Sequence, residues 1–205
     1  LKFSSPQVKK AAEQVGAIFL GEGMVYGGTK AIVSTSFGDA PSPMFADPPK
    51  CWLHKQGNFI TGFFPRGRAL KPGGGYSFCY LPGIDPAYGK PVLVGGDIWS
   101  MFNDRPEVRA VMAWFARGEH LKTWLASGGT VSPHSDAKLD WYGNDIDRAA
   151  AEILANATAV RFDGSDLMPG EVGAGSFWKE MTAWISGSED LDTALKNIDA
   201  SWPKN

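Results

Sequence analysis

The chain has 205 residues with a formal net charge of −2, and 43% of the residues are hydrophobic while 20% are charged. This balance is typical of a folded globular protein and excludes a disordered chain. Lys and Arg form no block, so neither nucleic acid nor an anionic membrane surface is an expected partner. Uninterrupted apolar runs fall short of the roughly 18 residues that a transmembrane helix needs.

The N-terminal part of the chain is predicted to be helical. Apolar residues at helical spacing predict a first helix over residues 6–20, which Gly21 and Gly23 end. A second, shorter helix is expected over residues 29–37. Prolines and glycines are then frequent, and they predict a loop over residues 38–50.

Strands are predicted further along. Short apolar and aromatic segments predict strands over residues 50–54 and 76–81, with a short helix over residues 56–64 between them. The segment 66–75 is basic and rich in glycine, but it lacks the GxxxxGK[ST] pattern of a phosphate-binding loop. We therefore interpret it as a surface turn.

A candidate binding corner follows the next strand. An apolar run over residues 91–94 predicts a buried strand that stops at Gly95-Gly96, and Asp97 and Trp99 come directly after it. Such a corner suits a sugar, because a carboxylate accepts hydrogen bonds from hydroxyls and an aromatic ring covers an apolar sugar face. A loop with a capping Asp and a half-buried Trp is the alternative.

Only helices are predicted after residue 105. Asp104 can cap the first of them, Pro106 suits its first turn, and Ser188 can cap the last. The predicted helices cover residues 106–117, 121–127, 145–157, 177–185 and 189–202, with loops over residues 130–141 and 160–175. This order predicts an α/β fold in which helices pack on a sheet of three or four strands, with a helical extension.

Cys51 and Cys79 are the two cysteines of the chain, and each lies in an apolar, strand-like context. Cysteines on neighbouring strands can form a disulfide, which would indicate an exported protein. Two buried free thiols are the alternative.

Motifs of catalysis and metal binding are absent from the sequence. No GxSxG, HExxH, CxxC or Walker pattern occurs. His54, His120 and His134 lack a partner at metal-ligand spacing. The acids around Asp163 resemble the start of a calcium loop without its closing Glu, so a turn is favoured. We expect no cofactor and no metal.

Several landmarks follow one another along nearly the whole chain. They are the helix over 6–20, the strand over 51–54 with Gly57-Asn58-Phe59 after it, the strand over 77–82, the Gly95-Gly96-Asp97 turn, the helix pair over 106–126, the loop 164–169, the helix opening Gly175-Ser176-Phe177-Trp178 and the helix end at 198–203. In their order and spacing, the chain resembles the C-terminal half of extracellular solute-binding proteins of family 1, the sugar-binding components of ABC transporters.

The resemblance implies a type II periplasmic-binding-protein-like fold, in which two α/β lobes joined by a hinge close on ligand in the cleft. Residues 1–96 and 158–205 would form the second lobe, a small mixed sheet flanked by helices. Residues 97–157 would be a helical segment that crosses to the first lobe. Most of that N-terminal lobe would be missing from this chain and would be its partner within the same protein.

The resemblance also implies the ligand contacts, which are Asn58, Phe59, Gly96, Asp97, Trp99 and Trp178. The residues around Trp178 agree with this role, because Gly173 and Gly175 leave room and a helix start offers free N–H donors. A core Trp packed against Trp184 is the alternative reading of Trp178.

The function implied is a carbohydrate-binding, non-catalytic component of a bacterial ABC importer. It would be periplasmic or extracellular, secreted or lipid-anchored, and would pass its ligand to permease subunits in the membrane. A secreted carbohydrate-active enzyme with Asp97 as acid or base is the rival hypothesis. A plain interaction module is the third.

Overall fold

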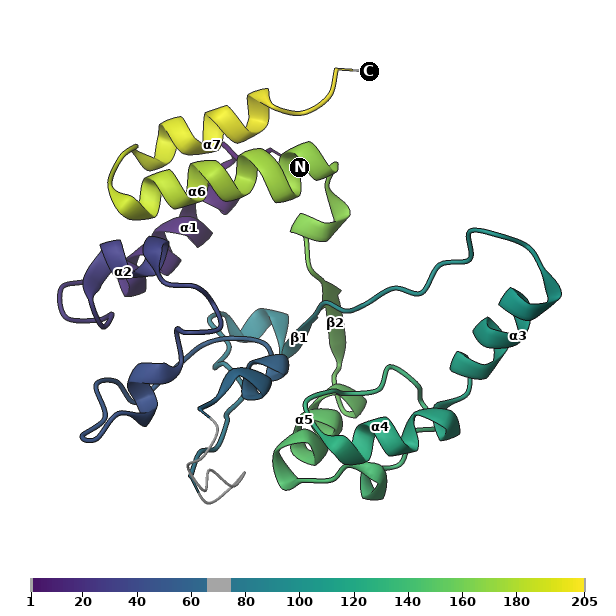
Figure 1. Ribbon diagram of the computed structural model, residues 1–205. Helices are drawn as coiled ribbons and strands as arrows, with labels where there is room; N and C mark the ends of the chain where they lie inside the picture. Colours follow the sequence, from purple (N-terminus) through teal and green to yellow (C-terminus); the bar gives the residue numbers. More distant parts are fainter. Residues whose placement is uncertain (1, 66–74, 205) are drawn as a thin grey trace. The chain divides into compact units, whose positions relative to one another are not determined.

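The computed structural model describes residues 2–65 and 75–204 (Figure 1). Its contacts divide the chain into two compact units. Unit 1 combines Leu1–His54 with Phe162–Asn205, and unit 2 is Lys55–Arg161. The boundaries predicted after residues 96 and 157 concern lobes rather than these units, and that lobe assignment stays a prediction. The surface turn predicted over residues 66–75 lies, except for its last residue, outside the described residues.

Unit 1 is built from helices. They are α1 (Pro6–Phe19), α2 (Gly28–Ser34), α6 (Phe177–Ser186) and α7 (Leu191–Ala200). Figure 1 shows α6 and α7 side by side, and α1 and α2 pack against this pair. The predictions of α1, α2, α6 and α7 are confirmed, and amphipathic spacing marks the face that α1, α6 and α7 bury.

The core of unit 1 joins segments from both ends of the chain. Phe3, which precedes α1, lies with its ring centroid 5.5 Å from that of Phe177 at the start of α6. Two clusters of buried side chains form this core: Phe3, Val172, Leu195 and Ile198, and next Ala12, Trp184, Ile185 and Ala194. Burial of this apolar surface is the main force that holds the helices together.

A π-helical turn precedes α6. Glu171–Ser176 forms this turn and leads directly into α6, so the loop predicted up to residue 175 is wrong here. Tight packing explains the turn: a Cβ on residue 173 would lie 2.0 Å from the Ser165 carbonyl oxygen. Gly173 is therefore required for close backbone approach, a demand that the sequence shows only as an unremarkable glycine.

Unit 2 contains short helices and a small sheet. Its elements are β1 (Pro91–Val94), α3 (Pro106–Phe115), α4 (Lys122–Ser127), α5 (Asp145–Ala155) and most of β2 (Ala159–Phe162). β1 and β2 pair as a two-stranded sheet. Turns of 3-10 helix cover Asn58–Phe63, Pro86–Tyr88, Gly118–Leu121 and Leu139–Trp141.

A buried carboxylate fixes the start of α5. Asp147 is 2% exposed, and it accepts hydrogen bonds from the Gly129 N–H at 2.8 Å and from Asn144 Nδ2 at 2.6 Å. Asn144 caps the helix in return, since its Oδ1 accepts the Asp147 N–H at 2.9 Å. These bonds compensate the desolvation of the charge and join α5 to the loop after α4. Leu125, Tyr142 and Ala151 form the apolar cluster of unit 2.

The described chain is mostly helical with a sheet of two strands, rather than the three or four strands predicted. Residues 50–54 and 76–81 are irregular, apart from an isolated bridge at Tyr76. The Tyr80 hydroxyl donates to the Pro91 carbonyl at 2.5 Å, so a side chain, not a backbone ladder, links this segment to β1. Apolar composition alone does not make a strand, because a strand also needs a hydrogen-bonded neighbour.

Neither of the two predicted helix caps forms. Arg105 occupies the N-cap position of α3 without a side-chain cap, and Asp104 pairs with Arg109 instead. The hydrogen bond from Arg109 lowers the pKa of Asp104. At α7, Asp190 is the cap that accepts the Thr193 N–H at 3.0 Å, so Ser188 is not. The Asp190 carboxylate is a stronger acceptor than the Ser188 hydroxyl, whereas the Asp104 carboxylate is engaged by Arg109.

Candidate functional site

The predicted binding corner lies at the end of β1. Gly96, Asp97 and Trp99 are all exposed and belong to an irregular segment that connects β1 to α3. The ring of Trp99 stacks on Phe115 of α3, with centroids 4.0 Å apart and planes 27° apart. One face of Trp99 is thus covered by protein. Trp99 nevertheless remains 54% exposed, and its free surface is open to a ligand.

The stack continues along the end of α3. Phe115 meets Trp114 edge to face with centroids 5.0 Å apart, and Trp114 stacks on His120 at 4.6 Å. The His120 ring also approaches the Trp114 carbonyl through Nδ1 at 2.7 Å. These contacts hold Trp99 at one end of a row of four aromatic rings, an arrangement that the separate sequence positions did not reveal.

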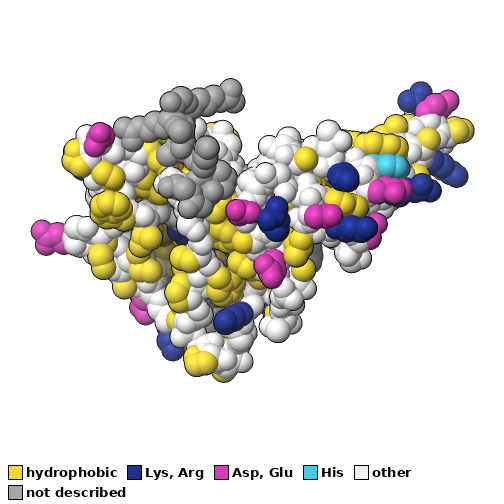
Figure 2. Space-filling view, turned by 90° about the horizontal axis from the view of Figure 1, so that it is seen from below, with side chains coloured by type: hydrophobic (Ala, Val, Ile, Leu, Met, Phe, Trp, Pro, Cys, Tyr) yellow, Lys and Arg dark blue, Asp and Glu magenta, His cyan; other side chains and the backbone are white. Residues whose placement is uncertain are grey.

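Helix α3 carries large apolar side chains but buries none of its residues. The exposed large hydrophobic residues of α3 and of the segment before it are Ile98, Trp99, Met101, Phe102, Val111 and Trp114. Figure 2 shows hydrophobic side chains at the molecular surface, interspersed with charged ones on the face drawn. Exposed large apolar side chains concentrated in one segment are typical of a face that contacts another protein segment or a ligand.

Asn58 and Phe59 open the 3-10 turn Asn58–Phe63, as the sequence predicted for a short helix there. Both are exposed, and Phe59 lies against Gly57, where a Cβ would come within 2.8 Å of the ring. This contact explains why glycine suits residue 57. The two side chains can reach a ligand from the surface of unit 2.

Trp178 lies on the surface of unit 1, with 71% of its area exposed. The alternative reading of Trp178 as a core residue is therefore wrong, and Trp184 is the buried tryptophan of α6. The expected free N–H donors are a second correction, because the π-helical turn precedes Phe177 and Trp178 does not lie at a helix end. Trp178 is thus available for stacking but not for a helix-terminus site.

The structure groups five of the six predicted ligand residues in unit 2 and places Trp178 in unit 1. Within unit 2, Gly96, Asp97 and Trp99 share one segment, and Asn58 and Phe59 share another. A joint site of Trp178 with these residues stays a prediction.

Two surface hollows contain none of the predicted residues. A hollow of about 470 Å³ in unit 2 lies along α5, and its lining is Ser77, Phe78, Asp145, Ile146, Ala149, Glu152, Ile153 and Asn156. A hollow of about 290 Å³ in unit 1 is lined by Phe3, Val8, Ala11, Ala12, Val15, Phe177, Met181 and Leu195. The second is wholly apolar, which is typical of an incompletely covered core rather than of a site for a polar solute.

Cys51 and Cys79, between which a disulfide was predicted, are both free thiols in the structure. Neither cysteine lies on a strand, so the expected pairing of neighbouring strands does not bring them together. The two residues belong to different units, and a bond between them stays a prediction. Cys79 is exposed, whereas partial burial raises the pKa of the Cys51 thiol.

Among the described residues, no group of three or more His, Cys, Asp or Glu side chains is placed to hold a metal ion. No described helix is both long and apolar enough to cross a membrane.

Comparison with known proteins gives two clear relatives. The chain is 41% identical over 204 residues to an osmoprotective compounds-binding protein, GgtB, of Synechocystis, a match that covers all of this chain and 48% of that protein. It is 36% identical over 204 residues to the alpha-glucosides-binding periplasmic protein AglE of Rhizobium meliloti, covering 98% of this chain and 44% of that protein.

No family model and no solved structure matches the chain. The chain spans about half the length of the curated relatives that it matches. Identity of this level along an entire chain reflects common ancestry, and it agrees with the resemblance carried by the order of the sequence landmarks. The chain is thus homologous to about half of each of these two solute-binding proteins.

Proposed function

We propose that the chain is part of the substrate-binding component of an ABC importer for sugars or related osmoprotective solutes. The observation that carries this proposal is the match along the whole chain to two solute-binding proteins, at 41% and 36% identity. One of these relatives is named for osmoprotective compounds and the other for α-glucosides. Both kinds of solute are small and polar, and we favour a carbohydrate because of the exposed aromatic residues.

The proposed mode of binding combines stacking with hydrogen bonds. Trp178 and the free surface of Trp99 would cover the apolar faces of sugar rings, and Asp97 would accept hydrogen bonds from hydroxyls. Asn58, Phe59 and Gly96 would complete the contacts. The chemistry is binding without bond cleavage, and ligand would stabilise a closed form of the protein.

The complete protein would supply the rest of the cleft. The relatives are about twice as long as this chain, so the lobe assignment of residues 1–96, 97–157 and 158–205 implies a further, N-terminal lobe. The exposed apolar face of α3 supports this view, because α3 buries none of its own residues and needs a cover. We propose that the N-terminal lobe covers α3.

Location and partners follow from the same proposal. One relative is named as a periplasmic protein, and we place this protein in the periplasm or outside the cytoplasmic membrane of a bacterium. Its partners would be the carbohydrate ligand and the permease subunits of the importer. The two free cysteines provide no evidence for or against export.

The rival hypothesis of a carbohydrate-active enzyme loses its basis. Both relatives are named as binding proteins, and neither name includes a reaction. Asp97 is exposed on an irregular segment, and among the described residues no second carboxyl group is paired with it. Incubation of the complete protein with chromogenic glycosides should therefore release no product.

Calorimetry of the complete protein tests the proposed function. We expect saturable binding of at least one α-glucoside at micromolar Kd or tighter, with glycine betaine as a zwitterionic osmoprotectant for comparison. Trp178→Ala should weaken that binding about tenfold, equivalent to about 1.4 kcal/mol. Absence of heat with a panel of mono- and disaccharides and with betaine would contradict the proposal. Tight binding of betaine alone would move it from carbohydrates to zwitterions.

A further inference from the structure

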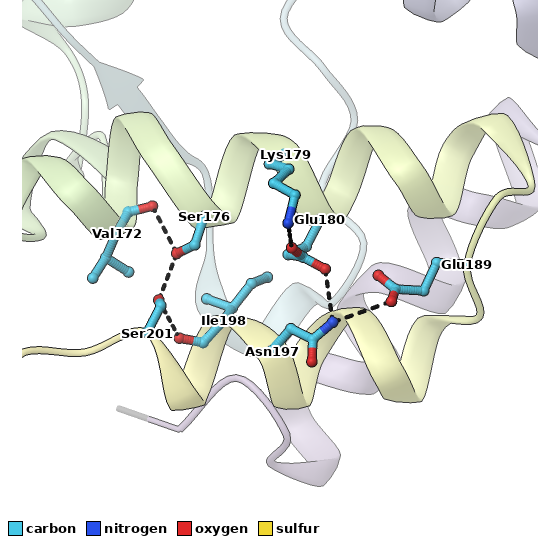
Figure 3. A network of polar contacts seen from close by, with 8 residues as sticks. All are labelled: Val172, Ser176, Lys179, Glu180, Glu189, Asn197, Ile198 and Ser201. Carbon is cyan, nitrogen blue, oxygen red and sulfur yellow. Dashed lines mark hydrogen bonds and ion pairs between the residues drawn. The ribbon is translucent and has the colours of Figure 1, made fainter.

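A network of polar side chains lies between α6 and α7 (Figure 3). Its centre is Glu180, a carboxylate on α6 that is only 5% exposed. Glu189, in the turn between the two helices, and Asn197, on α7, point toward it in the same view. A buried carboxylate needs compensation for the loss of water, so the donors around Glu180 decide its charge state.

Asn197 bridges the two carboxyl groups. Its Nδ2 lies 2.9 Å from Glu180 Oε2 and 3.1 Å from Glu189 Oε1. An amide nitrogen carries two hydrogens, so this single group donates one hydrogen bond to each acid and has no further hydrogen to donate. The two carboxyl groups are therefore neighbours, and two full negative charges at such a distance repel each other strongly.

Among the described residues, Lys179 is the lysine that pairs with Glu180. Lys179 Nζ lies 2.9 Å from Glu180 Oε1, while 81% of the lysine side chain is exposed. Asp190, which caps α7, adds another negative charge next to Glu189. Lys9 of α1 does not contribute, because it pairs with Asp192 of α7. Among the described residues, the buried Oε2 of Glu189 receives no hydrogen bond.

We propose that Glu180 and Glu189 share one proton and form a pH-dependent latch that holds the α6–α7 hairpin. Glu189 carries the proton and Glu180 the negative charge, which Lys179 and Asn197 stabilise. A proton on Glu189 removes the repulsion and gives its buried oxygen a donor role toward Glu180. The proposal does not depend on the identity of the ligand, and it concerns the hairpin on which Trp178 lies.

The electrostatic environment agrees with this assignment. Hydrogen bonds from Asn197 and Lys179 lower the pKa of Glu180 to about 2. The hydrogen bond with Glu180, burial, and the charges of Glu180 and Asp190 raise the pKa of Glu189 above that of an ordinary glutamate. The two acids thus shift in opposite directions, as expected when one proton serves both.

The pH dependence of stability follows from these directions. Below the ordinary glutamate pKa of 4.5, the unfolded chain takes up a proton that folded Glu180 refuses, so stability is lost as pH falls toward about 2. Above 4.5, folded Glu189 keeps a proton that the unfolded chain releases. The stabilisation that the protonated Glu189 contributes is therefore lost as pH rises through its raised pKa.

Two variants test the pH profile of stability. E189Q keeps a neutral donor at residue 189 at every pH, so the loss on the high-pH side should disappear. E180Q removes the charge that Asn197 and Lys179 stabilise, and it also removes the partner that raises the pKa of Glu189, so the losses on both sides should disappear. Where one proton differs, the unfolding equilibrium constant changes by up to tenfold per pH unit. Glu22→Gln is the matched control, because Glu22 is exposed and lies in the same unit.

The experiment is denaturant unfolding of the complete protein between pH 3 and about 9, with the three variants in parallel. We expect E189Q to differ from wild type on the high-pH side only and E180Q to differ on both sides, while Glu22→Gln runs parallel to wild type. Parallel profiles for all three variants would overturn the proposal. Carboxyl-carbon NMR of the wild-type protein tests it even if a variant does not fold. A Glu189 midpoint at or below that of Glu22 would then contradict it.

Discussion

The carboxylate of Asp199, near the end of α7, accepts the backbone N–H of Phe3 at 2.6 Å, so residues 196 positions apart in the sequence are in direct contact. The same carboxylate accepts the Ser4 N–H at 2.9 Å and the Ser4 hydroxyl. Phe3 is thereby held in the core against Leu195 and Ile198. Phe3 and Ser4 are thus an integral part of unit 1.

Removal of this carboxylate should destabilise unit 1. Asp199→Ala leaves the Phe3 and Ser4 donors without their acceptor, and we expect a loss of about 1–3 kcal/mol in the free energy of unfolding. Asp166→Asn, at an exposed aspartate of the same unit, is the control and should have little effect. Denaturant unfolding measures both, and equal stability of the two variants would show that the Asp199 contacts contribute nothing.

The contribution of Asp199 to the free energy of unfolding should decrease in acid. Burial acts to raise the pKa of Asp199, but the hydrogen bonds from Ser4 and Phe3 outweigh it and the net pKa is lowered. A lowered folded-state pKa gives stability that is present above the unfolded pKa, about 3.9, and is lost as pH falls through the folded value. The stability difference between wild type and Asp199→Ala should therefore shrink in acid.

The contact of Gly16 with Trp184 gives a second prediction. A Cβ on residue 16 would lie 2.9 Å from the Trp184 ring, although alanine is otherwise the better helix former. Gly16→Ala should therefore cost about 1–3 kcal/mol through overpacking and should change tryptophan fluorescence. Gly62→Ala is the control, because a Cβ there meets nothing within 4 Å. Unchanged or increased stability of Gly16→Ala would contradict the packing described for α1 and α6.

The two tryptophans of α6 should respond oppositely to mutation. Trp184 is buried in the core of unit 1, and Trp184→Ala should cost about 3–5 kcal/mol of stability. Trp178 is exposed, so Trp178→Ala should leave stability nearly unchanged while it weakens carbohydrate binding in the complete protein. Unfolding and calorimetry on the same samples separate the two effects. Normal binding by a stable Trp178→Ala protein would remove Trp178 from the site.

The cysteines provide a chemical test of the structure. Thiol titration of the denatured chain without reductant should find two thiols, and reductant should leave the melting temperature unchanged. In the native protein, Cys79 should react faster than Cys51, which is less exposed and whose raised pKa leaves less thiolate at neutral pH. Thiols that appear only after reduction would restore the disulfide interpretation.

Much of the helical structure is encoded locally and was predictable. The apolar spacing of α1 and α7 and the Pro106 start of α3 are properties of adjacent turns of one helix, so they are visible in the sequence. β1 was predictable for a similar reason, since an apolar run ends at paired glycines. The order of these landmarks also sufficed to identify the solute-binding relatives.

Tertiary structure alone decided what depends on partners distant in the sequence. Residues 50–54 look like a strand but lack a neighbouring strand, whereas β2 forms because β1 pairs with it. The π-helical turn before α6 depends on the close approach of Gly173 to Ser165, and the stacking of Trp99 depends on Phe115. Such contacts form only when separate segments pack together. Hydrogen bonds and side-chain packing depend on the distance between residues in space and not on their separation in the sequence.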